Sequence, residues 1–503
     1  KNKKIGKVLK KAVLTVVLTP VILLAIFIIP PVNSAVTGIV STVLSRKYSA
    51  EIEISHLYID PFSLSVWLKG VLVKDQTSDT LLYARRLHAN LDKFDTDKLT
   101  FEFKTVDLKD VTVKLIQDET EKFNFDFFIP KDTLEIEEED TAKTHFKILL
   151  NEILLEHIDF TLRTPTDKKP PKDFQMDYNN LVFKDINFYA KDFSLDDSLH
   201  IKSVITHIEA KEKCGFYLKN LSTVLDFSPQ GIILENLNIM TEETDFYTDK
   251  TVLKFNGFSE FGDNLSNIVT ETNILESSKV AFNDLGHFVP EVYSTDITAG
   301  ISGKISGKIG CLDIKKLKLS LTDSTTLKIN AFLKGLPDMD KFYFRLDTAV
   351  LTTSSADIRA LHQPINKNTP LFDLPDFLDG LGTVKFCAKS SGSINKLSLN
   401  AVLRSKLGNI NTKVRMNNSA NFMDINGFID AGGMNLAAIA GQNSGLGILS
   451  ARFDTLGVRI FPSGAVSGIA KGGVDSVSYN GYCYKNIIIN GDLPKNFSTE
   501  NSR

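Results

Sequence analysis

One segment rich in glycine and lysine, residues 300 to 310, has the residue types that cradle phosphate. Its sequence is GISGKISGKIG. A phosphate loop needs Ser or Thr directly after its Gly-Lys pair and a helix whose first amides point at the phosphate. Here Ile305 and Ile309 follow the two Gly-Lys pairs, and strand-like sequence surrounds them. We therefore interpret the segment as glycine-containing turns between strands.

The residues that serve metal, thiol or acid–base chemistry are scattered. Cys214, Cys311, Cys387 and Cys483 stand singly, without C-x-x-C spacing, and the eight histidines show no H-E-x-x-H pattern. We expect buried, unpaired thiols and no metal site. No G-x-S-x-G elbow occurs, and nothing in the sequence pairs particular carboxylates for acid–base work. We predict no cofactor and no catalytic residue: the protein binds or transports and is not an enzyme.

The charge balance argues against nucleic acid as a partner. The formal net charge is −3, and the only dense basic run is the first eleven residues, so the chain has no surplus of basic residues to neutralise phosphates. Phe outnumbers Tyr and Trp, at 34 against 12 and 1, so most aromatic surface lacks a polar group. Ordinary core phenylalanines and a lipid-facing surface explain this count equally well.

An uncharged stretch near the start predicts a membrane anchor. Residues 12 to 32 read AVLTVVLTPVILLAIFIIPPV, 21 positions that at about 1.5 Å each cross a hydrocarbon core of about 30 Å. Pro20 is expected to kink this helix. The anchoring side chains are Val13, Leu14, Val17, Leu18, Val21, Ile22, Leu23, Leu24, Ile26, Phe27, Ile28 and Ile29.

The flanking charges orient this anchor. Six lysines precede it, and the next basic residue after it is Arg46, which places the N-terminus in the cytoplasm and the bulk of the chain outside it. A cleaved signal peptide is the alternative, with Val32 and Ser34 as its small-residue site, but the apolar stretch is longer than a signal-peptide core.

A short amphipathic helix follows the anchor. Val36, Ile39, Val40, Val43 and Leu44 form one apolar stripe that Asn33 or Ser34 can cap. Two placements are open: the helix rests on the outer leaflet, or it packs against the end of its own protein's sheet.

From Tyr48 onward the sequence alternates with a period of two, which predicts antiparallel strands with one buried face. Segments 99 to 103, 111 to 115, 317 to 321, 342 to 346 and 397 to 403 show this pattern. The predicted apolar lining is Phe101, Phe103, Val111, Val113, Leu115, Leu317, Leu319, Leu321, Phe342, Phe344, Leu397 and Leu399.

Three short apolar segments interrupt the strands at similar intervals. They begin at Asp284, Asp357 and Asn435, 73 and 78 residues apart, and each looks like a helical turn that ends a group of strands. Such a repeat is typical of an elongated array, although three weakly similar copies also arise by chance. An acidic connector, residues 131 to 145, and a Pro/Lys loop, residues 164 to 174, are interpreted as solvated loops.

The expected fold is mainly β: an elongated, curled antiparallel groove with one N-terminal transmembrane helix. On the order of 30 strands at about 4.8 Å each would give a sheet roughly 140 Å long, which must curl. Either its own side chains fill the trough, or it stays open to an apolar ligand. The expected regions are a tail and anchor (1–32), a helix (33–47), an N-terminal β region (48–130), a β-groove with the two loops (131–283) and repeated groove units (284–503).

Several segments carry a resemblance to a known family. They are KGVLVKD from Lys69 to Asp75, LLYARRL from Leu81 to Leu87, VDLKDVTV from Val106 to Val113, KFNFDF from Lys122 to Phe127, DLGHFVPE from Asp284 to Glu291, and YNGYCYKNIIING from Tyr479 to Gly491. With the preceding anchor, they resemble the AsmA-like superfamily, and within it the TamB type of translocation and assembly module subunit. These motifs are structural, so no catalytic residue is carried over.

The resemblance implies a protein of the inner membrane with one span, whose periplasmic β-groove conducts phospholipid toward the outer membrane and supports its biogenesis. It also implies an Omp85-type outer-membrane barrel as a partner. Proteins of this type are usually longer and meet that barrel through a C-terminal domain. This sequence ends in mid-pattern, at PKNFSTENSR, so we expect a fragment or a truncated relative.

Three functions are therefore open. A lipid conduit predicts phospholipid along the apolar face, and an assembly scaffold or chaperone for outer-membrane proteins predicts protein partners at exposed strand edges. An inert stalk predicts that charges placed on the apolar face affect folding alone.

Overall fold

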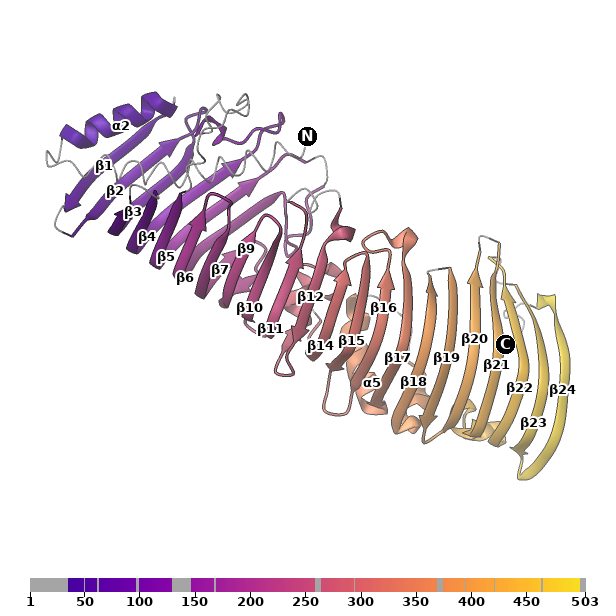
Figure 1. Ribbon diagram of the computed structural model, residues 1–503. Coiled ribbons are helices and arrows are strands. Elements are labelled where there is room, and N and C mark those ends of the chain that lie inside the picture. The colour runs from indigo at the N-terminus through magenta and orange to yellow at the C-terminus, as the bar shows by residue number, and fades with distance from the viewer. Residues whose placement is uncertain are drawn as a thin grey trace. The chain divides into compact units, whose positions relative to one another are not determined.

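The computed structural model contains two compact units, each built on a β-sheet (Figure 1). Unit 1 comprises the residues up to Asn264 together with Asp284–Tyr293, and unit 2 comprises Leu265–Asn283 and the residues from Ser294 onward. The structure describes residues 35–48, 50–60, 63–95, 99–128, 146–166, 169–257, 264–293, 295–368, 374–393, 395–419, 421–462 and 465–497. The predicted anchor, residues 12 to 32, and the acidic connector lie outside these ranges. Within them, no helix has both the length and the apolar character needed to cross a membrane.

Within the described residues, unit 1 is a sheet of mostly long strands preceded by a helix. The helix is α2 (Ala35–Tyr48) and a 3₁₀ turn is η1 (Asp126–Phe128). The strands are β1 (Ile52–Asp60), β2 (Ser65–Lys74), β3 (Thr80–Asp95), β4 (Thr100–Ile116), β5 (Lys147–Arg163), β6 (Asn180–Asp196), β7 (Ile201–Glu212), β8 (Tyr217–Leu218), β9 (Asn220–Ser228), β10 (Gly231–Met240) and β11 (Asp245–Lys254).

The described strand pairs of unit 1 join strands that are consecutive in the chain, except that β8 and β9 both pair with β7, and all but one of these pairs run antiparallel. The exception is the pair β4–β5, which is parallel, so the prediction of a wholly antiparallel sheet is wrong at this point. A parallel pair needs a return connection of a dozen or more residues. The chain between Ile116 and Lys147 is long enough for that connection.

Unit 2 continues the same construction. Its strands are β12 (Val269–Ile274), β13 (Lys279–Ala281), β14 (Thr298–Lys308), β15 (Cys311–Ser320), β16 (Thr326–Lys334), β17 (Tyr343–Ser354), β18 (Thr383–Ser393), β19 (Lys396–Ser405), β20 (Gly408–Asn418), β21 (Met423–Asn435), β22 (Leu446–Ile460), β23 (Val466–Tyr479) and β24 (Tyr482–Phe497). Strands β12 and β13 both pair with β14, and from β14 to β24 each strand is antiparallel to the next. The prediction of a mainly β chain is confirmed, and the described strand pairs of unit 2 are antiparallel, as predicted.

The recurring helical turn is also confirmed. Helices α4 (Phe282–Gly286), α5 (Ser355–Asn368) and α6 (Leu436–Ala440) each follow a strand without a break. A 3₁₀ turn follows each helix along the chain: η4 (Pro290–Val292), η6 (Asp376–Leu381) and η7 (Gln442–Ser444). The described residues also contain the 3₁₀ turns η3 (Leu265–Asn267) and η5 (Met339–Lys341). Strands β14 to β17 separate α4 from α5, and β18 to β21 separate α5 from α6.

Helix α2 packs against its own sheet. Leu44 and Tyr48 are buried in a cluster with Ile52 of β1. The hydroxyls of Ser41 and Ser45 accept hydrogen bonds from the backbone N–H groups of Ile54 and Ile52, at 3.2 and 3.0 Å. These N–H groups would otherwise be unpaired at the sheet edge, so the helix closes that edge.

Two smaller predictions are wrong in part. Gly300, Gly303 and Gly307 lie inside strand β14, and only Gly310 lies in a turn. Gly303 has φ +144, and a Cβ there would come within 2.7 Å of the Leu317 Cα, which explains glycine at this close approach. All four cysteines are free, but Cys311 and Cys483 are exposed, so the expectation of burial fails for these two.

The Pro/Lys loop is not solvated throughout. The Phe174 ring stacks on the Tyr293 ring with centroids 3.6 Å apart, and the carbonyl of Phe174 accepts a hydrogen bond from His287 Nδ1 at 2.6 Å. Phe174 lacks the polar group that would keep it in water, and the α4–η4 segment gives it an aromatic surface to cover.

Candidate functional site: the apolar sheet face

The strand registers place apolar residues in rows that run across the strands. We call the side of each sheet that carries these rows the apolar face, and the other side the polar face. In unit 1, one row from β1 to β6 consists of Ile52, Val73, Leu82, Val113, Phe160 and Phe183. A second row from β1 to β7 consists of Leu57, Leu68, Leu87, Leu108, Leu155, Phe188 and Ile208.

Unit 2 carries a row of the same kind from β15 to β24. Its members are Leu319, Leu327, Leu351, Phe386, Leu403, Ile410, Ala431, Ala451, Val474 and Ile487. Directly opposed residues on neighbouring strands are about 4.5–5.5 Å apart at Cβ, so the row is a continuous apolar track.

The long strands keep one apolar face only because their alternation is broken at set places. On β4 the apolar face takes Phe101, Phe103, Val106, Leu108, Val111, Val113 and Leu115; on β5 it takes Ile148, Leu150, Ile153, Leu155, Ile158, Phe160 and Leu162. Both strands therefore advance by two, three, two, three, two and two residues. Each three-residue step leaves two successive residues on the polar face.

One set of these steps aligns across the strands of unit 1. Gly70, Asp110, His157 and Asp185 all have φ between +53 and +62, in the left-handed region. Gly70 lies beside Ser55, whose Oγ a Cβ on Gly70 would meet at 2.4 Å, so only glycine fits without a shift. The extra residue at such a step bends a strand.

The polar face at this level is covered by ion pairs. Arg85 and Asp110 are 3.1 Å apart, Lys109 and Glu156 also 3.1 Å, and Arg86 donates to both oxygens of Asp107 at 2.9 Å. His157 Nδ1 lies 2.6 Å from Asp185 Oδ1, and this hydrogen bond raises the pKa of His157 above its usual value. Exposed pairs of this kind add little stability, so they mark the polar face as the hydrated one.

The predicted lining residues do not share one environment. Phe101, Phe103 and Val111 are buried, at 7, 3 and 3% exposure, and both phenylalanines belong to a filled cluster with Ile148 and Leu195. The other nine predicted lining residues are half-buried: Val113, Leu115, Leu317, Leu319, Leu321, Phe342, Phe344, Leu397 and Leu399. Leu321 and Phe342 lie just outside β15 and β17.

Most residues of the apolar face of each unit were not predicted from the sequence. Strands β5, β6, β7, β16 and β20 to β23 contribute row members that were not among the predicted lining residues, such as Phe160 and Leu327. For β5 the signal was present in the sequence, because its apolar residues have the same two- and three-residue spacing as those of β4. Among the described residues, the largest side chains with under 2% exposure are only Ile268, Thr248 and Ser278.

The buried thiol and carboxylate of unit 1 are structural. Burial would raise the pKa of Glu212, but hydrogen bonds from the backbone N–H groups of Cys214 and Val182, at 2.7 and 2.9 Å, outweigh it and hold that pKa low. Burial, with Glu212 close by, raises the pKa of Cys214 to about 11. The thiol therefore stays protonated at neutral pH and is a poor nucleophile.

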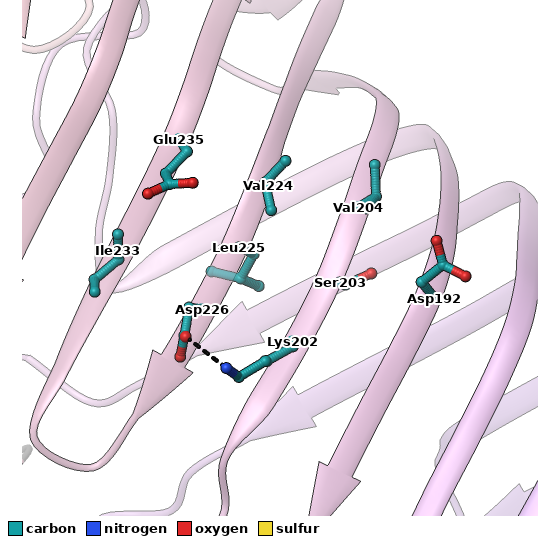
Figure 2. Close-up of a pocket in the computed structure, with 9 residues that line it drawn as sticks. All are labelled: Asp192, Lys202, Ser203, Val204, Val224, Leu225, Asp226, Ile233 and Glu235. Atoms are coloured by element: carbon teal, nitrogen blue, oxygen red, sulfur yellow. Dashed lines mark ion pairs between the residues drawn. The ribbon is translucent and has the colours of Figure 1, made fainter.

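A depression of about 250 Å³ opens on the polar face of unit 1, lined by residues of β6, β7, β9 and β10 (Figure 2). Lys202 and Asp226 form an ion pair across it at 3.1 Å, as the dashed line in Figure 2 marks. Asp192 and Glu235 add two carboxylates beside the exposed Val224. It lies where the registers of β6–β7 and β9–β10 shift, so we interpret it as a result of those irregularities. No three Asp, Glu, His or Cys residues in the described ranges are placed to hold a metal.

Compared with known proteins, the chain matches no family model, no curated protein and no solved structure. The apolar face is therefore the feature on which its function has to be argued.

Proposed function

We propose that this protein is a non-enzymatic, inner-membrane-anchored conduit whose apolar face carries phospholipid acyl chains through the periplasm toward the outer membrane. The single supporting observation is the set of apolar rows that run across the strands, most of whose members are only half-buried. The anchor, the compartment and the resemblance to the AsmA-like superfamily come from the sequence.

An acyl chain that lies along a row meets a side chain at every strand, about 4.8 Å apart. Each buried methylene contributes about 0.8 kcal/mol, so even a few occupied strands hold a chain firmly. No single strong pocket is needed. When an acyl chain moves from one strand to the next, it replaces its apolar contacts with similar ones. In this proposal the three-residue steps bend the strands so that the sheets curl around the apolar face as a groove.

A pair of adjacent residues on β19 tests the conduit. Leu399 is half-buried on the apolar face, and its neighbour Asn400 is exposed on the polar face. We expect Leu399→Lys to lower the phospholipid that co-purifies with gently extracted protein roughly tenfold, because it removes several methylene contacts and adds a charge. Asn400→Lys, the matched control, should leave it unchanged. Mass spectrometry of the bound lipid measures both; a lipid-free wild type would refute the proposal.

The second candidate is a scaffold for outer-membrane proteins that works with an Omp85-type barrel, and strand β24 favours it. All described register partners of β24 lie in β23, and Tyr482 and Ile488 are 71% and 87% exposed. A strand that pairs on one side and carries exposed apolar side chains is a template for another strand. A photocrosslinking residue in place of Ile488 would capture protein in this case, whereas lipid crosslinks at Leu399 without protein at Ile488 favour the conduit.

A further inference from the structure

The chain after β4 turns back onto the apolar face of unit 1. Residues 117 to 128 include four phenylalanines, and Phe125, Phe127 and Phe128 pack against a buried cluster formed by α2, β1, β2 and β3. Leu115, Leu82 and Val71 of the apolar face pack against the same cluster. Tyr48 of α2 meets Phe128 with ring centroids 4.9 Å apart. We call Phe123–Phe128 and α2 together the plug.

One asparagine fastens this turn to the sheet. The Asn124 side chain accepts from the N–H of Ile116 at 3.0 Å and donates to the carbonyl of Lys114, also at 3.0 Å. Its backbone N–H donates to the carbonyl of Ile116 at 2.8 Å. Its Nδ2 also lies 3.3 Å from Oδ2 of Asp75, a carboxylate only 7% exposed. Asp75 and Asn124 both lie in segments that carry the family resemblance, and neither residue was assigned a catalytic role there.

The covered rows are the ones that continue into the rest of the sheet. Leu82 is in the row that passes through Val113 to Phe160, and Leu115 pairs with Leu162 of β5. A ligand lying along these rows and the phenylalanines of the plug need the same surface. In unit 2 the corresponding surface is lined by half-buried residues around three small ones, Ala349, Ala388 and Ala401.

We infer that the plug closes the apolar face at β1 to β4, so that lipid occupies the rows of unit 2 and reaches the first strands only when the Phe123–Phe128 turn releases. This inference rests on the proposed function and adds its regulation. Release breaks the hydrogen bonds of Asn124 and exposes three phenylalanine rings, while an incoming acyl chain takes over the same apolar contacts. The Phe123–Phe128 turn therefore blocks the first strands of the apolar face until an incoming lipid displaces it.

Site-specific photocrosslinking tests the plug in the chain of 503 residues. A leucine-sized diazirine residue replaces Leu115, beside the plug, or Leu399 in unit 2, and the protein is incubated with vesicles of radiolabelled phosphatidylethanolamine and phosphatidylglycerol. In the wild-type background we expect label at Leu399 and little at Leu115. In Asn124→Ala, which loses the side-chain contacts, labelling at Leu115 should rise roughly tenfold, the effect of about 1.4 kcal/mol, with Leu399 unchanged.

The outcomes separate the two proposals. Equal labelling at Leu115 and Leu399 in the wild type overturns the plug and leaves the conduit standing, whereas no labelling at either position overturns the conduit and with it the plug. No rise at Leu115 in Asn124→Ala also overturns the plug. If Asn124→Ala does not fold, Asp75→Asn, which removes one contact of Asn124, replaces it under the same criteria.

Discussion

Replacing Asp75 with Asn should loosen the turn of residues 117 to 128 without disturbing the hairpin that holds Asp75. In the wild type, Asp75 Oδ1 accepts from Thr77 Oγ1 at 2.7 Å and from the N–H groups of Thr77 and Asp79, both at 2.9 Å. Its Oδ2 accepts from Asn124 at 3.3 Å. Burial alone would raise the pKa of Asp75, but these bonds outweigh it and hold that pKa below its usual value, so the group is a carboxylate at neutral pH.

Asparagine keeps one oxygen for the hairpin but presents NH₂ to the Nδ2 of Asn124, donor against donor. A hydrogen bond to a charged acceptor contributes about 1.5–3 kcal/mol, and at 3.3 Å we take the lower end. The opening free energy of the turn should fall by about 1.5 kcal/mol, roughly a tenfold loss of protection from amide hydrogen exchange. Hydrogen–deuterium exchange with mass spectrometry, read on peptides covering residues 117 to 128, measures this loss.

A matched control exists in the same unit. Asp196 holds a hairpin of the same form, accepting from Ser198 Oγ and from the N–H groups of Ser198 and His200, but it has no contact with Asn124. Asp196→Asn should leave exchange in residues 117 to 128 unchanged. If both variants, or neither, accelerate amide hydrogen exchange in residues 117 to 128, the proposed role of the contact between Asp75 and Asn124 in holding the turn is refuted.

Other expected outcomes concern unit 2. Asp357→Ala should lower the free energy of unfolding in urea by about 2 kcal/mol, because the hydroxyls of Ser324 and two threonines donate to this carboxylate; exposed Asp347→Ala is the control. The hydrogen bond from Ser324, the largest cause, lowers the pKa of Asp357 from 3.8, so its contribution is full above about pH 4 and is lost as pH falls through the folded-state pKa. The loss of stability between pH 7 and pH 3 should then be smaller in Asp357→Ala, and an equal loss would contradict this assignment. On β24, the substitution Ile488→Lys at an exposed residue should change the free energy of unfolding by less than about 0.5 kcal/mol. The substitution Ile489→Lys at the neighbouring half-buried residue should change it by more, and thermal melting measures both. A larger effect at Ile488 would show that the apolar face of β24 is assigned to the wrong side.

Much of the fold could be predicted from the sequence because its signals are local. Alternation identified strands, and the segments at Asp284, Asp357 and Asn435 were found as helical turns. The prediction failed where alternation breaks: residues 99 to 103 and 111 to 115 read as two separate stretches, but all of them except Leu99 belong to one strand, β4. The intervening Val106 and Leu108 keep the same face through two three-residue steps, a pattern that a strict period of two rejects.

Other features could not be predicted, because they depend on partners far away in the chain. The parallel β4–β5 pair is set by which strand the chain returns to. The contact between Asp75 and Asn124 joins residues 49 positions apart in the sequence, and the stacking of Phe174 on Tyr293 joins two loops. The local sequence pattern carries no information about such long-range contacts, so the plug could not be predicted from the sequence.

Two variants at a three-residue step of β4 distinguish the effect of the backbone conformation at Asp110 from the effect of the extra residue itself. Asp110 has φ +53, which glycine adopts more readily, and its exposed pair with Arg85 is worth little, so Asp110→Gly should change the free energy of unfolding by less than about 1 kcal/mol. Deleting Asp110 removes the step itself. Val111 and Val113 would then turn to the polar face and Lys114 to the apolar one, because a one-residue slip reverses every side chain beyond it. Burying those polar groups costs several kcal/mol, enough to unfold unit 1. Circular dichroism and limited proteolysis of both variants measure this, and a deletion variant as stable as Asp110→Gly would show that the apolar rows do not depend on these steps.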